Sequence, residues 1–159
     1  MIQEDNNTIY LKLIDLLKRN NASFREVSHE SEGRSDRVAS LRGSSVEQGA
    51  KAMVLQAENK FVLAVIPGNL KVDFKKVAEA VNEKKATLAS IEDAKELTHC
   101  EIGAIPPFVF NNKITLVVDI SITKFDEIAF NAARLDRSIF LKTSDYLRIA
   151  KPIIKHITK

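Results

Sequence analysis

The sequence predicts an α+β domain with a largely antiparallel or mixed sheet. Several segments repeat apolar residues at the three- and four-residue spacing of an amphipathic helix, and others are short apolar runs typical of buried strands. The two kinds of segment mix without the regular strand–helix–strand alternation of a parallel α/β fold. We therefore expect one domain of mixed elements, with the order of the strands left open.

Composition fits a single domain over residues 1–159. A chain of this length buries roughly two thirds of its unfolded surface, and no linker, repeat or compositional break divides it. The first residues lack the basic and apolar stretches of a signal peptide, and no apolar run approaches the ~20 residues of a membrane span. One cysteine cannot form an internal disulfide. We expect a cytoplasmic protein that does not contact a membrane.

Helical periodicity and capping residues predict the helices. The expected ranges are 8–20, 35–42, 73–82, 90–97 and a stretch from Thr143 that Pro152 interrupts. The expected caps are Thr8, Ser35, Asp73 and Ser90, with Ser90 and Asp93 in the spacing of a capping box and Gly43 ending the second helix.

Short apolar runs predict the strands. The expected ranges are 23–28, 50–57, 61–68, 85–89, 113–120, 127–132 and 138–142. A polar turn at residues 58–60 joins the second and third ranges into a hairpin, and Asp119 is expected to cap the turn that follows its strand.

Lys51 lies inside the apolar strand AKAMVLQA. The two-residue period places it on one face with Met53 and Leu55, while its neighbours and Val54 occupy the other face. A lysine is almost never fully buried without a partner, so the ammonium must reach water, a carboxylate or an anionic ligand. Two interpretations stay open: an edge strand whose lysine extends into solvent, or a cleft that binds an anion.

The segment GAIPP combines one glycine with two prolines. Proline lacks an N–H and fixes its own backbone angle, so Pro106 and Pro107 hold the segment extended without donating. The remaining donors are the amides of Gly103, Ala104 and Ile105, which could hold a carbonyl oxygen or a developing oxyanion. A plain turn between two elements is the alternative that spacing alone favours.

Other reactive side chains carry weaker signals. The histidines His29, His99 and His156 show no metal-ligand spacing, and we expect no metal or organic cofactor. His156 is expected in solvent. Cys100 has no visible base partner and is expected to be a structural thiol. The common phosphate-loop, zinc-protease and nucleophile-elbow motifs do not occur in the sequence.

Taken in order, these pieces resemble the YbaK/EbsC family, which includes bacterial prolyl-tRNA synthetase editing domains and their freestanding relatives. The resemblance rests on SFREVSHE, the pair Ser35 and Asp36, GAKAMVL, VIPGNLKVDFKKVAEAV, GAIPP and FNAAR. It spans roughly residues 9–149. The order and spacing of these motifs together carry the resemblance.

The resemblance implies a curved mixed sheet with surrounding helices and a trans-editing activity. A mischarged tRNA carrying a small amino acid would be deacylated, with Lys51 contacting the phosphate or ribose of the terminal adenosine and the GAIPP amides positioning the aminoacyl group. No protein nucleophile is needed, because a hydroxyl or thiol of the substrate can assist the attack. The implied catalytic positions are Lys51 and Gly103, and the implied substrate-binding positions are Ala104, Ile105, Pro106, Pro107, His29, Ser35 and Asn131.

The implied partner is the 3′ end of an aminoacyl-tRNA. The net charge of +3 does not predict tight tRNA binding, so a synthetase or an elongation factor is the candidate for delivering the substrate. The chain departs from the family at Ala52, where threonine is common, and at His99, Val109 and Ala133, where glycine is common. The departures at His99, Val109 and Ala133 motivate one alternative, a module that binds the aminoacyl-adenosine or tRNA end without hydrolysis. A further alternative is a structural or regulatory partner of a synthetase in which the GAIPP segment is only a turn.

Overall fold

The helices of the computed structural model, which describes residues 6–159, lie close to the ranges that the sequence predicts. They are α1 (Asn6–Arg19), α2 (Ser35–Arg42), α3 (Phe74–Ala80), α4 (Ile91–Thr98), α5 (Thr143–Ala150) and the short 3-10 helix η1 (Ile120–Lys124). The predicted caps Asp73 and Ser90 are confirmed, because each side chain accepts from an amide three residues later. Two caps were wrong: Thr8 lies inside α1, and Ser35 opens α2 after Arg34, whose side chain makes no capping bond.

Apolar runs form the strands where the sequence predicts them. They are β1 (Phe24–Ser28), β2 (Ala50–Ala57), β3 (Lys60–Pro67), β4 (Thr87–Leu88), β5 (Ile114–Asp119), β6 (Glu127–Arg134), β7 (Arg137–Lys142) and β8 (Ile153–Lys155). Strand β8 was not expected. The chain leaves α5 through Lys151 in the left-handed conformation, passes Pro152 and pairs in parallel with β5.

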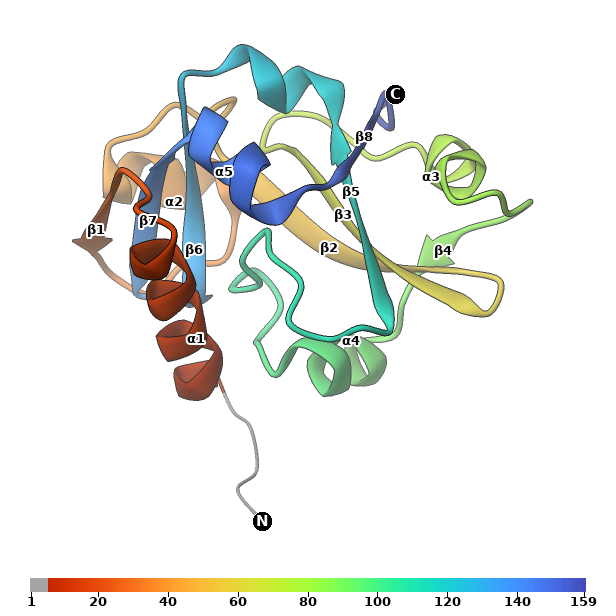
Figure 1. The fold of residues 1–159 in the computed structure, drawn as a ribbon, viewed down its shortest axis with the longest axis horizontal. Helices are drawn as coiled ribbons and strands as arrows, with labels where there is room; N and C mark the ends of the chain where they lie inside the picture. Colours follow the sequence, from red (N-terminus) through yellow and green to blue (C-terminus); the bar gives the residue numbers. More distant parts are fainter. Residues whose placement is uncertain (1–5) are drawn as a thin grey trace.

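The strands form two sheets. The order β1-β7-β6 is antiparallel throughout, and the order β4-β2-β3-β5-β8 combines antiparallel and parallel pairs. A bridge between Gly49 and Ala129 connects the start of β2 to β6. Figure 1 shows the smaller sheet with α1 and α2 on one side of the molecule and α3 on the other. The predicted α+β class with mixed strand pairing is confirmed.

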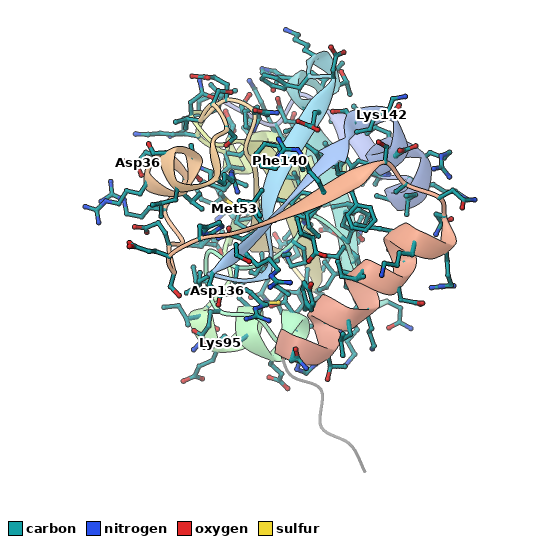
Figure 2. All side chains as sticks on the ribbon, turned by 90° about the vertical axis from the view of Figure 1, so that its left-hand side faces the viewer. Asp36, Met53, Lys95, Asp136, Phe140 and Lys142 are labelled. Carbon is teal, nitrogen blue, oxygen red and sulfur yellow. The ribbon has the colours of Figure 1, made fainter. Side chains whose placement is uncertain are left out.

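The central strands of the larger sheet are largely buried on both faces, whereas the residues of β4 and β8 are exposed. Leu55, Val62 and Ile66 point toward the cluster that includes Val77 of α3, while alternating residues of the same strands join the main core beneath α1 and the smaller sheet. Figure 2 shows β1 crossing in front of the other two strands of the smaller sheet, with Asp36 marking α2 and Lys95 marking α4. Within residues 6–159, no helix combines the length and the apolar character needed to cross a bilayer.

Asp119 holds the end of the chain against β5. Its buried carboxylate accepts from the Ile157 amide at 2.8 Å and the Thr158 hydroxyl at 3.2 Å. It also caps η1 through the amide and hydroxyl of Ser121, as the sequence predicts for a cap. Burial alone would raise the pKa of this carboxyl, but these hydrogen bonds lower it below its ordinary value.

We expect the substitution Asp119→Asn to lower the free energy of unfolding by about 2–3 kcal/mol at pH 7, because the amide nitrogen would face donors in a buried site. A carboxyl with a lowered folded-state pKa stabilises the fold above its unfolded pKa and loses that contribution as the pH falls through the folded value. The difference between wild type and variant should therefore shrink below about pH 4. Urea unfolding followed from pH 7 to pH 3 measures it, and a constant difference would contradict the assignment.

Candidate active site

A small cavity opens where α2, β2, β6 and two loops meet. Its volume is about 40 Å³, which is room for a few water molecules or a small polar group. The lining residues are Gly33, Ser35, Val38, Arg42, Gly49, Ala50, Lys51, Ala52, Gly103, Ile105, Phe130 and Asn131. The structure therefore gathers five of the nine predicted site residues around one cavity: Ser35, Lys51, Gly103, Ile105 and Asn131.

Lys51 is half-buried at the wall of this cavity. Its Nζ donates to the carbonyl oxygen of Leu70 at 3.2 Å. Burial lowers the pKa of the ammonium from its ordinary value. The position agrees with the interpretation of a cleft rather than a lysine extended into bulk solvent, because Lys51 shares the cavity with Gly103.

Gly103 is required by a close approach between two loops. Its backbone has φ = +92°, and a β-carbon there would lie 2.7 Å from the Cα and 2.9 Å from the carbonyl oxygen of Gly33. Real β-carbons do not approach backbone atoms so closely. A side chain at position 103 would therefore push the two loops apart as well as strain the backbone.

Asn131 ties these two loops together. Its Nδ2 donates to the carbonyl oxygens of Glu32 and Gly103, both at 2.9 Å. Only the amide nitrogen can donate, so the carboxamide orientation is determined by its partners, and Oδ1 accepts from the Ser138 hydroxyl at 3.0 Å. Asn131 is 6% exposed, and this network is shielded from water.

His29 supports Asn131 through Ser138 and does not line the cavity. The Ser138 hydroxyl has given its one hydrogen to Asn131, so the His29 Nε2 at 2.7 Å donates to it. The other ring nitrogen lies 2.8 Å from the Glu30 carbonyl oxygen. His29 therefore contacts the cavity residue Asn131 only through Ser138, and its contact with substrate stays a prediction.

Arg42 is the cavity residue that sequence reasoning missed. It is 7% exposed, and burial lowers the pKa of its guanidinium to about 10. Its Nε and Nη1 donate to the hydroxyls of Ser44 at 3.0 Å and Ser138 at 3.3 Å, and no carboxylate within residues 6–159 pairs with it. A signal was available, because the helical spacing of Val38 and Arg42 places this arginine on the buried face of α2.

The GAIPP segment supplies fewer donors than the sequence suggests. The Ala104 amide is occupied, because it donates to the Glu101 carbonyl oxygen at 2.9 Å. Within the described part of the chain, the amides of Gly103 and Ile105 have no intramolecular acceptor, and both residues line the cavity. These two amides remain as donors for a ligand.

The prolines fix the segment from its far side. Pro106 lines a different pocket, and the carbonyl oxygen of Pro107 accepts from the buried Tyr146 hydroxyl at 2.7 Å. Phe108 packs edge-on against Tyr146 and Phe130 in the core. Ala104, Pro106 and Pro107 therefore hold the segment rigid and do not line the Lys51 cavity.

Cys100 is buried, and burial raises the pKa of its thiol to about 12. A thiol held protonated at neutral pH is a poor nucleophile, as expected for a structural residue. His156 is exposed, as predicted. Among residues 6–159, no group of three or more histidine, cysteine, aspartate or glutamate side chains is arranged to hold a metal ion.

Comparison with known proteins shows the family to which the chain belongs. The family model of the aminoacyl-tRNA editing domain matches residues 29–149 of the chain. The chain belongs to the aminoacyl-tRNA editing domain family. The predicted membership and the predicted enzyme class, an editing hydrolase, are confirmed.

The relatives include a protein of about the same length as this chain and a much longer synthetase of which the match covers only a part. The chain is 45% identical over 146 residues to the multifunctional Ser/Thr-tRNA deacylase ProXp-y of Escherichia coli (strain K12), covering 89% of this chain and 87% of the relative. It is 30% identical over 84 residues to the proline–tRNA ligase of Bacillus cereus (strain Q1). This match covers 53% of this chain and 15% of the ligase. A solved structure described as a candidate trans-editing enzyme for prolyl-tRNA synthetase shares the fold, with a TM-score of 0.82, 17% identity and 99% of both chains covered.

The departures from the family mostly concern the backbone, not the cavity. His99 and Ala133 have φ values of +57° and +64°, the left-handed region where glycine is unstrained. His99 and Val109 line a separate pocket. Of these four residues, Ala52 alone lines the Lys51 cavity.

We expect Gly103→Ala to lower the free energy of unfolding by about 2–4 kcal/mol, because backbone strain and the clash with Gly33 add together. Gly43 is a matched control: it has φ = +81°, but a β-carbon placed there would meet no atom within 4 Å, so Gly43→Ala should cost only about 1 kcal/mol. Urea unfolding and a deacylation assay measure both variants. Equal losses of stability would show that the contact with Gly33 is unimportant.

Proposed function

We propose that this editing domain hydrolyses the ester of seryl- or threonyl-tRNA. The observation that carries the proposal is the 45% identity to a Ser/Thr-tRNA deacylase over nearly the whole of both chains. The cavity supports it, because a volume of about 40 Å³ with hydroxyl, carboxamide and amide groups suits a short polar side chain. A bulky or cyclic aminoacyl group would be excluded by size.

Lys51 would bind the phosphate or ribose of the terminal adenosine. Among the described residues its ammonium has one acceptor, the Leu70 carbonyl, which leaves two N–H groups for a ligand. Arg42 adds a second positive charge to the same wall, and no carboxylate in the described part of the chain pairs with it. Two cations around a small cavity favour an anionic group at the end of the tRNA.

The amides of Gly103 and Ile105 would hold the carbonyl oxygen of the ester. Water attacks the carbonyl carbon, the carbon–oxygen bond to the ribose breaks, and the ribose oxygen takes up a proton. Negative charge develops on the carbonyl oxygen during the attack, and fixed amides stabilise it without reorganisation. The substrate's own hydroxyl can assist the water, so no protein nucleophile is required.

Delivery by a synthetase or an elongation factor remains our proposal for how the charged tRNA reaches the enzyme. The cavity accommodates only the end of the molecule, and a partner that already holds mischarged tRNA would supply it. Addition of a synthetase or of the elongation factor to the assay should raise the deacylation rate at limiting substrate. An unchanged rate would show that the added protein does not deliver the substrate.

We expect Lys51→Ala to reduce deacylation of seryl- and threonyl-tRNA by about 100-fold or more while the protein stays folded. The assay compares alanyl-, cysteinyl-, seryl- and threonyl-tRNA with wild type, Lys51→Ala and Lys84→Ala, since Lys84 is exposed and outside the cavity. Thermal unfolding of each variant serves as the folding control.

Unchanged turnover by Lys51→Ala would contradict the role of Lys51. Absence of turnover of all four substrates by wild type, together with binding of a non-hydrolysable aminoacyl-adenosine analogue, would instead support a binding module.

A further inference from the structure

Two segments far apart in the sequence form one surface beside α3. Val72 and Thr158 pair as an antiparallel bridge, the Lys159 amide donates to the Lys71 carbonyl at 3.0 Å, and the Asp73 amide donates to the Ile157 carbonyl at 2.8 Å. Figure 1 shows α3 and the end of the chain on the same side of the molecule. Residues 71–80 and 153–159 are thus held together by backbone hydrogen bonds.

This surface contains the whole excess positive charge of the protein. The two segments contain five lysines, one histidine and two carboxylates, Asp73 and Glu79, whereas the rest of the chain has 19 basic and 19 acidic residues. The formal excess of three on the surface therefore equals the net charge of +3 of the chain. Four of the lysines, Lys71, Lys75, Lys155 and Lys159, are exposed. A cluster of positive charge such as this one favours the binding of a polyanion.

A hollow of about 250 Å³ lies within the surface. Lys76, Lys155 and His156 line it together with Glu79 and Ala80. The Lys76 ammonium donates to the Thr158 carbonyl at 2.9 Å and lies 2.8 Å from the His156 Nε2, so its position is fixed by two partners. One of its three N–H groups remains for a ligand.

The surface begins at the wall of the Lys51 cavity. Lys51 donates to the carbonyl oxygen of Leu70, and Lys71 is the next residue along the chain. From there the lysines continue along the start of α3 and the end of the chain. A polyanion whose end enters the cavity would therefore meet this surface next.

We propose that residues 71–76 and 155–159 bind the phosphates of the tRNA acceptor stem while the aminoacylated end occupies the cavity. The inference rests on the proposed function, because it places the tRNA end beside Lys51. A nucleic acid backbone fits the surface because it presents regularly spaced negative charges to several lysines at once. The contacts would position the substrate and would not depend on its sequence.

The test compares two triple variants with the same change in net charge. Lys71→Gln/Lys75→Gln/Lys155→Gln removes three exposed charges from the surface, and Lys18→Gln/Lys84→Gln/Lys113→Gln removes three exposed charges elsewhere. Each is assayed with full-length seryl-tRNA and with seryl-adenosine, which has no acceptor stem. Circular dichroism and thermal unfolding verify that both variants are folded.

We expect the surface variant to lose about tenfold or more in kcat/KM for seryl-tRNA at low salt, with seryl-adenosine turnover unchanged. The slope of log kcat/KM against log salt concentration should flatten by about 2–3, because each lost phosphate contact removes roughly one released counterion. An equal loss in the control variant, or an equal loss on seryl-adenosine, would overturn the proposal.

Binding of uncharged tRNA separates this proposal from the proposed function. If wild type hydrolyses neither substrate, the deacylase assignment fails, and the surface is still tested by the affinity for uncharged tRNA. Weaker binding by the surface variant alone supports the surface, and equal binding by both variants overturns it.

Discussion

The carboxamide of Asn131 is the interaction on which the site depends. It donates one hydrogen to each of two loops, through the carbonyls of Glu32 and Gly103, and so closes the cavity from a rigid strand. Each hydrogen bond contributes only about 1 kcal/mol to stability, but together they hold Gly33 and Gly103 in contact. With the prolines and the Tyr146 hydroxyl fixing the far side of the segment, this tie sets the distance between the Gly103 loop and the loop that contains Gly33.

The tie is itself positioned by a bulge in β6. The register of β6 and β7 shifts between Asn131 and Arg134, and Ala133 adopts φ = +64° inside the bulge. Alanine in this conformation costs roughly 1–2 kcal/mol relative to the right-handed region. Ser138 on β7 then accepts from His29 and Arg42 and donates to Asn131. The strained backbone at Ala133 and the fully hydrogen-bonded Ser138 hydroxyl thus together orient the Asn131 side chain.

Most elements could be predicted from the sequence because their signals are local. Short apolar runs mark β2 and β3, and caps mark α3 and α4. Strand β8 could not be predicted, since its three exposed residues gain strand geometry only from pairing with β5. The same limit applies to the site. The positions of Lys51, Gly103 and Asn131 follow from family motifs, but the use of the Ala104 amide in a turn depends on the folded loop.

The cavity wall carries an electrostatic cost that the folded chain does not relieve by itself. Arg42 is buried without a carboxylate among the described residues, and burial also disfavours the charged form of Lys51. Apolar residues of similar volume would serve stability better at both places, because desolvation of a cation is offset only by a well-placed anion or several acceptors. Hydroxyl and carbonyl partners offset part of the cost here. Under the proposed function, a negative group that entered the cavity would offset the remainder, so the same two charges that weaken the fold by themselves would strengthen its complex with an anionic ligand.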